Sequence, residues 1–523
     1  MAYDVIVIGG GHNGLVAAAK LAKGGKKVLV LERRNIVGGA AVTEEPYRGF
    51  RYSTCAYSPG LFQSSIAEEL NLSNYGYATM EFDPALVAPS PDGEPFIFWN
   101  DQKKTVEDIA KKSSKDAQRY PEYVANMERL LKHLRPLLTK ALPDPATAGV
   151  GDIRELLALG WKLKGLREKD ILEMLRVLPM SIYDLMDQYF ENRHLKGVLA
   201  SEGIFGHFYG PRSAGSVYLM LYLRMGRDEG SKFGWPFCKG GIGTLTQAIA
   251  QSAKNQGVEI RTGVEVAQVL ITDGAASGVV LASGEEIASK LVVSNADAKR
   301  TFLKLVDPSY LEPHFLIKVR GIKSRGVSCK VNLALDSYPN WKGLDSVQQP
   351  PALCIAPDMD YLEKAFDDAK YGRPSKAPFL DIAIPSVVDS SISPHGKHVM
   401  SVYALFAPYH LKEGDWNQKR EEFGDTVVKT IEAYAPGFSN LILHRQVITP
   451  LDLENEFGLT EGNINQGEMS LDQIMFMRPI SGYSRYRTPI ENLYLCGAAT
   501  HPGGGVTGIP GSLAASQILS DWK

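Results

Sequence analysis

Three glycines near the start of the chain have the spacing of a turn that holds the pyrophosphate of a dinucleotide. The sequence after the first apolar run is GGGHNG, in which Gly9, Gly11 and Gly14 match the pattern G-x-G-x-x-G. The first glycine of this pattern allows a tight turn, the second lets the backbone approach the pyrophosphate, and the third lets helix and strand pack closely. The backbone N–H groups at His12 and Asn13 would then face the anion at the start of a helix.

The segments around these glycines have the order of a nucleotide-binding βαβ unit. Residues 3–8 form a short run rich in Val and Ile, which predicts a buried parallel strand. A helix-like segment follows, and a second predicted strand at 27–31 ends beside Glu32 and Arg33. Glu32 follows Gly14 at close to the spacing of about 20 positions at which an acid binds ribose hydroxyls. We therefore predict a dinucleotide site rather than a glycine-rich turn without a ligand.

A glycine pair that follows the acid distinguishes between the two common dinucleotides, FAD and NAD. After Glu32 the chain reads RRNIVGGAAV, which places Gly38, Gly39, Ala40 and Ala41 shortly beyond the acid. Here the sequence resembles the glutathione-reductase-like flavoproteins, which carry such a pair after the second strand. The resemblance implies that the pair brings the backbone close to the diphosphate and ribityl chain of FAD.

The far end of the chain is also rich in glycine. A short apolar run at 493–496 leads into a glycine-rich loop at 503–508, followed by a predicted helix near 512–519. The loop also fits G-x-G-x-x-G, but the sequence reaches Lys523 too soon after it for the rest of a second βαβ unit. We expect instead that the loop lets the backbone approach the flavin ring, whose electron-rich side the helix N-terminus would favour. The cofactor-binding residues expected here are Gly497, Gly504, Gly505 and Val506.

Five segments spread over the whole chain resemble the phytoene desaturase-like family of flavoproteins. They are GGGHNGLVAAA at 9–19, ERRNIVGGAAVTEE at 32–45, GGIGTLTQAIA at 240–250, MSLDQIMFMRP at 469–479 and LYLCGAATHPGGGVTGIPG at 493–511. The resemblance implies an α/β fold with a glutathione-reductase-type, Rossmann-like FAD-binding domain and an inserted α+β substrate domain of helices and an antiparallel sheet. It also implies that Val266 meets the adenine through its backbone amide and that Asn295 ends the strand returning from a β-meander.

The resemblance also sets the expected domain organisation. The FAD-binding domain comprises residues 1–80, 236–305 and 485–523, and the substrate domain comprises residues 81–235 and 306–484. Residues 83–100 contain four prolines and are interpreted as a loop, whereas residues from about 103 to 200 have a mostly helical pattern. Six basic and four acidic residues between Arg154 and Arg176 predict a solvated helix face or, as the sharper alternative, a helix on a membrane surface.

Composition excludes several classes of function. The 523 residues are 44% hydrophobic and 22% charged, and the net charge of -2 gives no reason to expect nucleic acid binding. No apolar run is long enough for a membrane-spanning helix. The closest two of the five cysteines, Cys329 and Cys354, are too far apart for C-x-x-C redox and zinc patterns. Because a strand is predicted from Tyr3, we expect no leader peptide. We therefore expect a cytoplasmic protein that touches membranes to collect its apolar substrate. In a eukaryote, a mitochondrial location is the alternative.

The electron partner and one departure from the family pattern follow from the same motifs. The chain has no other convincing dinucleotide fingerprint, so we predict that oxygen, a quinone or the substrate exchanges electrons with the flavin, rather than NAD(P)H.

Many desaturases and amine oxidases have Arg after the glycine pair, where this chain has Ala40. This difference argues against a simple phytoene desaturase or amine oxidase.

Three residues are candidates for chemistry beside the flavin. His501 lies in the C-terminal glycine-rich loop, and its alternative role is a hydrogen bond to backbone. Arg478 would contact the flavin or a substrate carboxylate, or else form a structural ion pair. His207, in GIFGHFYGP, would line the substrate cavity or be a satisfied core histidine. The histidines are scattered and lack metal-ligand spacing, so no metal is expected.

Three functions are compatible with these features. The first is oxidation or reduction of a C–C bond in an apolar, isoprenoid- or carotenoid-like substrate, which needs little proton machinery because flavin carries the difficult step. The second is a flavin amine oxidase, which predicts a narrow site with an aromatic cage. The third is a binding or regulatory flavoprotein whose FAD is structural.

Overall fold

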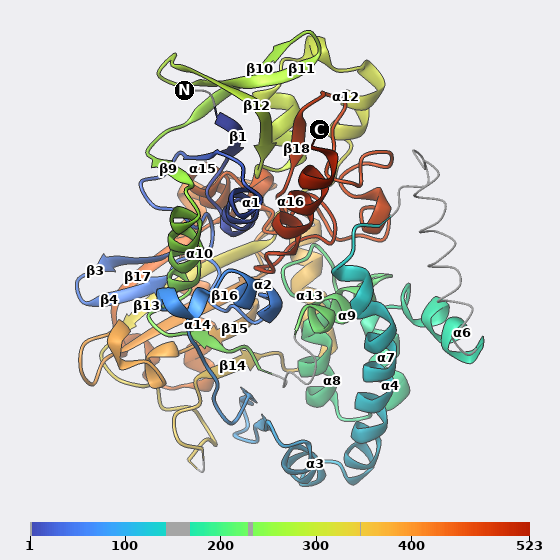
Figure 1. Ribbon diagram of the computed structural model, residues 1–523. Helices are drawn as coiled ribbons and strands as arrows, with labels where there is room; N and C mark the ends of the chain where they lie inside the picture. The colour runs from blue at the N-terminus through green and yellow to red at the C-terminus, as the bar shows by residue number, and fades with distance from the viewer. Residues whose placement is uncertain (1–2, 143–167, 228–233, 346, 523) are drawn as a thin grey trace.

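A mostly parallel sheet forms one half of the molecule. The computed structural model describes residues 3–142, 168–227, 234–345 and 347–522 (Figure 1). The parallel strands are β1 (Tyr3–Ile8), β2 (Val28–Glu32), β9 (Glu259–Thr262), β12 (Glu286–Ser294) and β18 (Leu493–Leu495). They are ordered β18, β12, β1, β2, β9, so strands from both ends of the chain lie in one sheet.

Alternate residues of β1 face two different apolar layers. Val5 and Val7 pack with three helices, α1 (His12–Lys23), α10 (Gly243–Asn255) and α16 (Ile509–Asp521), which lie side by side in Figure 1. Ile6 and Ile8 face the opposite layer, which the β-meander and residues 298–322 cover. The meander consists of β10 (Val266–Thr272), β11 (Ala275–Leu281) and the first half of β12, and residues 298–322 include α11 (Ala298–Arg300) and α12 (Pro313–Arg320). Burial on both faces explains the apolar runs of β1 and β2.

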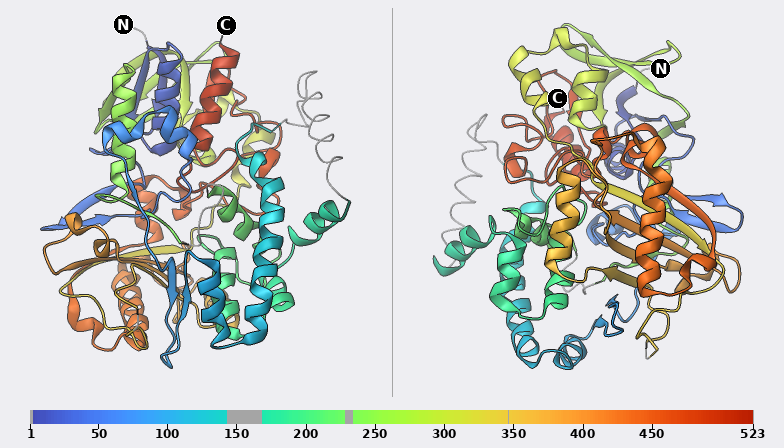
Figure 2. Two further views of the ribbon diagram at one scale, coloured as in Figure 1. Left: turned by 60° about the horizontal axis from the view of Figure 1, so that its bottom comes forward. Right: turned by 180° about the vertical axis from the view of Figure 1, so that it is seen from behind.

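A second sheet of seven strands forms the other half. Its order is β17 (Ile442–Ile448), β13 (Ser328–Leu335), β16 (His398–Leu405), β15 (Phe379–Ala383), β14 (Ala352–Ile355), β6 (Leu86–Ala88) and β7 (Phe96–Phe98). Helix α14 (Trp416–Tyr434) lies across one face of this sheet, as Figure 2 shows, and its apolar residues complete a separate core there. Side chains on the opposite face point toward the first sheet.

Helices and short hairpins complete the described structure. The helical side consists of α3 (Gln102–Ala110), α4 (Ser114–Leu138), α6 (Glu168–Val177), α7 (Ile182–Tyr189), α8 (Arg193–Ala200), α9 (Ser216–Gly226) and α13 (Met359–Lys370). The shorter elements include β3 (Thr43–Tyr47), β4 (Phe50–Ser53), α2 (Ser64–Glu69), β5 (Thr79–Met80), β8 (Phe237–Cys238) and α15 (Pro450–Phe457). Among the described residues, no helix is both long and apolar enough to cross a membrane.

The topology confirms the predicted fold class, a Rossmann-like sheet with a meander and an inserted α+β part. Two details of the prediction were wrong. Residues 83–100 are not a loop throughout, because β6 and β7 form a hairpin at the edge of the second sheet; β6 fits between Pro84 and Pro89, and β7 follows Pro95. The second sheet is not purely antiparallel, because β14 pairs in parallel with β6. The exact domain boundaries stay a prediction, and most of the charged segment 154–176 lies outside the described residues.

Candidate FAD and substrate site

A cavity of about 610 Å³ lies between the two sheets. One part of its wall comes from loops at the ends of the first sheet's strands, and another comes from the polar face of the second sheet. Sixteen of the residues predicted from sequence line it: Gly9, Gly11, His12, Asn13, Glu32, Arg33, Gly38, Gly39, Ala40, Ala41, Val266, Asn295, Gly504, Gly505, Val506 and His207. Four others, Gly14, Gly497, Arg478 and His501, are not part of the wall.

The two N-terminal glycine motifs lie directly against each other. The Gly38 N–H donates to the Gly10 carbonyl over 2.8 Å, and Gly38 forms a parallel bridge with Gly11. A Cβ on Gly39 would come within 3.2 Å of the Gly11 Cα. Gly14 has a packing role, because a Cβ there would lie 2.3 Å from the Gly9 carbonyl oxygen. The absence of side chains leaves a concave backbone surface at the N-terminus of α1.

Glu32 stands at the end of β2, facing this surface. One carboxylate oxygen accepts the Gly10 N–H over 2.8 Å and the other accepts the Arg34 N–H over 2.9 Å. A carboxylate offers about four lone-pair sites, so these two bonds leave acceptors for ligand hydroxyls. Glu32 is therefore anchored by backbone and still suited to bind a ribose.

Two polar atoms at the start of α1 favour a bound ligand. His12 Nε2 and Asn13 Oδ1 are buried and have no hydrogen-bond partner among the residues that the structure describes. Desolvation lowers the pKa of His12 to about 4, so the ring is neutral at physiological pH, and it bonds to the backbone of Gly505 in the C-terminal loop. Because buried polar groups in native proteins are almost always paired, these atoms fit a polar cofactor such as FAD.

The C-terminal loop is held against the same wall. The Gln466 side chain donates to the Asn295 carbonyl over 3.1 Å and accepts the Ala499 N–H over 3.0 Å. Tyr222 donates to the Gly504 carbonyl over 2.7 Å, and a Cβ on Gly504 would lie 1.9 Å from Asn465 Oδ1. Only glycine fits at position 504, so backbone rather than side chain forms the wall there. Sequence reasoning missed Asn465 and Gln466, which have no motif.

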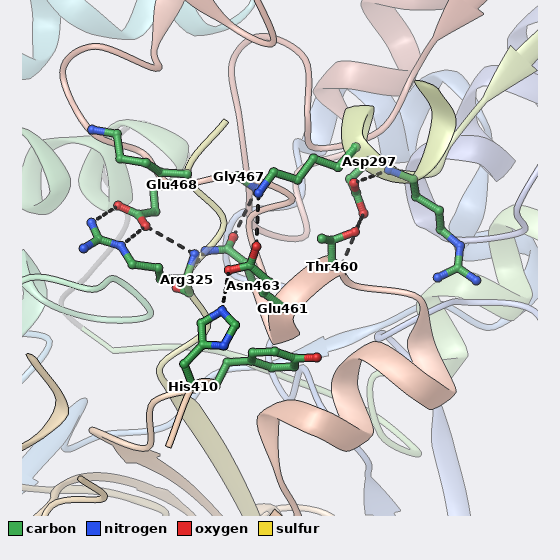
Figure 3. A network of polar contacts seen from close by, with 12 residues as sticks. Asp297, Arg325, His410, Thr460, Glu461, Asn463, Gly467 and Glu468 are labelled. Carbon is green, nitrogen blue, oxygen red and sulfur yellow. Dashed lines mark hydrogen bonds and ion pairs between the residues drawn. The ribbon is translucent and has the colours of Figure 1, made fainter. Parts of the chain in front are cut away.

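A polar network fixes the segment that carries these two amides (Figure 3). Thr460 donates to Asp297 over 2.6 Å, beside α11 of the first half. Asn463 donates to the Arg325 carbonyl over 3.2 Å, and the Arg325 guanidinium pairs with Glu468 at 2.6 Å and 2.8 Å. The network joins the two halves of the molecule along one side of the cavity.

Arg478 has a structural role. It is 2% exposed and donates to five backbone carbonyls, including that of Ala498 over 2.7 Å and that of Glu468 over 3.0 Å. The other three carbonyls belong to Asn465, Gly467 and Gln473. The guanidinium is thus used in loop anchoring, and neither a flavin contact nor an ion pair is supported.

The two candidate histidines differ in position. His501 is buried away from the cavity wall, with Nε2 2.8 Å from the Leu137 carbonyl, so it fits the backbone-bonding role that sequence left open. His207 lines the cavity, and its Nδ1 is 3.4 Å from the Asn465 amide. Burial lowers the pKa of His207 to about 3, so it is neutral at physiological pH.

The second sheet presents a polar face to the cavity. Lys330 on β13 lies opposite Tyr403 on β16, which lies opposite Asp381 on β15, so their side chains form a row on one face. Tyr403 shares a hydrogen bond with Ser328, and Tyr57 donates to Asp381. The signal in the sequence is the alternation in SCKVNLAL, where Ser328, Lys330 and Asn332 alternate with apolar residues in a wholly buried strand.

Aromatic rings form the apolar part of this wall. The Phe205 ring lies 4.7 Å from that of Tyr403 and 6.3 Å from that of Trp235, and all three residues line the cavity. Leu61, Leu223 and Ile464 add aliphatic surface. The wall therefore combines an apolar surface with a small number of buried polar groups, as is typical of small-molecule sites.

Comparison with known proteins identifies the family. Residues 14–518 match the family described as flavin containing amine oxidoreductase. A rat protein, pyridine nucleotide-disulfide oxidoreductase domain-containing protein 2, is 38% identical over all of this chain and 94% of its own length. The five cysteines of the present chain are all buried and unpaired. That arrangement gives no support to disulphide chemistry.

Two more distant relatives are named for limonene and phytoene. A limonene dehydrogenase subunit of Castellaniella defragrans is 28% identical over 99% of this chain and 94% of its own. The neurosporene-forming phytoene desaturase of Cereibacter sphaeroides is 26% identical over 98% and 94%. An oxidoreductase structure from Methanosarcina mazei shares the fold, with a TM-score of 0.63, 16% identity, and coverage of 99% of this chain and 100% of its own. The chain is thus an FAD-dependent oxidoreductase and belongs to the flavin-containing amine oxidoreductase family.

Proposed function

We propose that this enzyme removes or adds two hydrogens at a C–C bond of a mostly apolar, isoprenoid-like substrate. The observation that carries the proposal is the wall of the cavity, where Phe205, Trp235 and Tyr403 form a continuous aromatic surface. Burial of an apolar chain against such a surface contributes about 25 cal/mol per Å². The names of the limonene and phytoene relatives agree with this substrate class.

The chain's own residues would bind the cofactor, orient the substrate and shield both from water. FAD, when bound, supplies the two-electron chemistry by accepting or returning a hydride. Gly11, Gly38 and Glu32 would hold the dinucleotide, while the aromatic wall orients the substrate and excludes water. Tyr57 lines the cavity and donates to Asp381, and burial raises the pKa of Asp381 to about 6. This pair gives the proton lost from carbon a place to go: the Tyr57 oxygen accepts it as the phenolic proton passes to Asp381.

The experiment combines ligand identification with flavin redox chemistry. Native mass spectrometry of purified protein is expected to release FAD and an apolar ligand. After anaerobic photoreduction, reoxidation by oxygen, a quinone and polyene substrates is followed by flavin absorbance. We expect rapid reoxidation by at least one of them. A flavin that no acceptor reoxidises would instead favour the regulatory role with structural FAD.

Amine oxidation is the second candidate, favoured by the same aromatic rings and by the family description. It predicts that primary or secondary amines reduce the flavin anaerobically and yield hydrogen peroxide in air. Failure of a panel of alkyl and aryl amines to reduce the flavin would exclude this candidate, whereas dehydrogenation of an apolar substrate would not be affected.

A further inference from the structure

A second, smaller cavity of about 40 Å³ lies behind the aromatic wall of the first. Among the described residues, four line both cavities: Tyr57, Phe205, Leu223 and Trp235. Asp381 is 8% exposed and lines only the second cavity. Tyr57 therefore belongs to the wall between the two cavities, and its hydrogen-bond partner Asp381 opens on the far side of that wall.

The polar row of the second sheet crosses the same boundary. Asp381 on β15 lies opposite Tyr403 of β16 on one side and opposite Cys354 of β14 on the other. Tyr403 lines the first cavity, whereas Cys354 lines the second. Asp381 thus stands at the point where the row passes from the flavin cavity to the smaller one.

The smaller cavity is charged and large enough for water. Glu202 and Arg227 line it together with Asp381. A buried water needs about 10–15 Å³ and two to four polar partners, and this cavity offers both. Glu202 pairs with two guanidinium groups, those of Arg224 and Arg227, so one positive charge is left over beside Asp381.

These surroundings let Asp381 change its protonation state near neutral pH. Burial raises the pKa of Asp381 to about 6, while the hydrogen bond from Tyr57 and the cations of Lys330 and Arg227 favour its ionised form. The titratable groups that face it from the neighbouring strands and loops are Tyr57, Lys330, Arg227, Tyr403 and Cys354. None of them is a second carboxylate, so no other acid shares the proton of Asp381.

We propose that Asp381 passes protons to water held in the second cavity, so that the proton lost from the substrate leaves the flavin cavity through its Tyr57 wall. This inference rests on the proposed function, in which the C–C bond loses a hydride to the flavin and one proton. The Tyr57 oxygen binds that proton as its phenolic proton passes to Asp381, which then protonates a water molecule and becomes a carboxylate again. Water therefore need not enter the flavin cavity, where it would compete with the apolar substrate.

The test follows the Asp381 carboxyl group by infrared spectroscopy in the FAD-loaded full chain. At a pH of about 6, the difference between wild type and Asp381→Asn should show the carbonyl stretch of a protonated carboxyl group. This band shifts when deuterium replaces the proton. After rapid mixing with D2O, we expect the shift to finish within the mixing time of a stopped-flow instrument. The measurement needs no substrate, so it is independent of the proposed function.

Two variants distinguish the second cavity from the first as the route of exchange. Ala383 lies two positions after Asp381 on β15 and lines the second cavity, so Ala383→Leu fills it. We expect the exchange in Ala383→Leu to become a resolved phase, slower than in wild type by at least about tenfold. Tyr57→Phe keeps an aromatic wall but removes the hydroxyl link to the flavin cavity, so exchange at Asp381 should stay as fast as in wild type.

An exposed alanine gives the matched control. Ala110 is on α3 and lines neither cavity, so Ala110→Leu should exchange like wild type. Circular dichroism and flavin content establish that each variant folds and keeps FAD. If Ala383→Leu fails to fold, Ala383→Val adds less volume and should slow the exchange in the same direction.

Three outcomes would overturn the inference. It is wrong if wild type shows no protonated Asp381 band, or if exchange in a folded Ala383 variant is as fast as in wild type. It is also wrong if Tyr57→Phe slows the exchange, because the proton would then pass through the flavin cavity. Failure of every acceptor to reoxidise the flavin would contradict only the proposed function.

Discussion

Single atoms at the glycine-rich turn decide whether the cavity has room for a cofactor. A Cβ on Gly11 would lie 2.8 Å from Asn295 Nδ2, which is the end of a side chain that can move. The backbone conformation at Gly11 is extended, with φ of -69°, so a larger residue there fits the strand-to-helix turn without backbone strain. A side chain at this position is therefore expected to weaken ligand binding rather than the stability of the fold.

We expect Gly11→Val to fold but to lose FAD. The added methyl groups enter the cavity where the pyrophosphate would lie, so purified protein should have less than about a tenth of the wild-type flavin absorbance, a loss of at least ~1.4 kcal/mol of binding free energy. Gly321→Ala, at a helix end where the new Cβ makes only ordinary contacts, is the control and should keep its flavin. Full flavin content in Gly11→Val would contradict the assignment.

Substitution of Arg478 tests whether this buried cation stabilises the fold or takes part in flavin chemistry. A lysine has three donors and no planar fork, so Arg478→Lys would leave at least two of five buried carbonyls without a partner. We expect the free energy of unfolding to decrease by about 2–4 kcal/mol. Denaturant unfolding measures this loss. Flavin reoxidation rates near wild type at low temperature would agree with a structural role, and a selective loss of rate without loss of stability would refute it.

At the scale of elements, two helices from opposite ends of the chain share the first sheet's face. Helix α1 begins at the glycine-rich turn and α16 follows the C-terminal glycine-rich loop, so their contact sets the distance between the two loops. The backbones of α16 and α1 approach so closely that a Cβ added at Gly511 would lie 2.0 Å from the Asn13 carbonyl oxygen. Backbone, unlike a side-chain end, cannot give way locally.

We expect Gly511→Ala to separate α16 from α1 and to weaken both stability and FAD binding. Overpacking of this kind costs about 1–3 kcal/mol, and the displaced loop at 504–506 would enlarge the cavity. Thermal melts with and without added FAD measure the two effects. Ser520→Ala, on the exposed side of α16, is the matched control. Unchanged FAD affinity in Gly511→Ala would show that the helix contact does not position the loop.

At the scale of the whole molecule, buried neutral histidines make the fold sensitive to acid. Burial lowers the pKa of His207 to about 3 and that of His501 to about 4, whereas both titrate near 6.5 when unfolded. Between these values the unfolded chain binds more protons than the native chain, so native stability falls as pH falls. The contribution is complete above the unfolded pKa and decreases as the pH falls toward the folded values.

We expect each of these histidines to remove about 1 kcal/mol of stability when the pH falls from 6.5 to 5.5. Denaturant unfolding at the two pH values measures the total change, in which carboxylates also take part. His207→Phe keeps an aromatic ring but cannot titrate, so its loss over the same interval should be smaller by about 1 kcal/mol. An identical pH dependence in variant and wild type would show that His207 does not contribute in this range.

Sequence patterns were sufficient to predict the cofactor-binding half of the fold. Gly9, Gly11 and Gly14 act through local backbone geometry, and Glu32 and Gly38 follow at short, fixed spacing, so a pattern in one segment predicts their common position. The buried strands are equally local, because burial on both faces produces an apolar run that periodicity reveals.

The side chains that line the other part of the cavity could be recognised only in the folded chain. Lys330 and Tyr403 line the cavity from strands far apart in the sequence, and sheet pairing, which no local pattern encodes, places them in one row with Asp381, to which Tyr57 donates. The fold also distinguished between two residues that the sequence had offered as candidates for chemistry. His207 faces the cavity, whereas Arg478 donates to five backbone carbonyls. Local backbone preferences are set within one segment, whereas the partner of a buried polar group is set by packing of the whole chain.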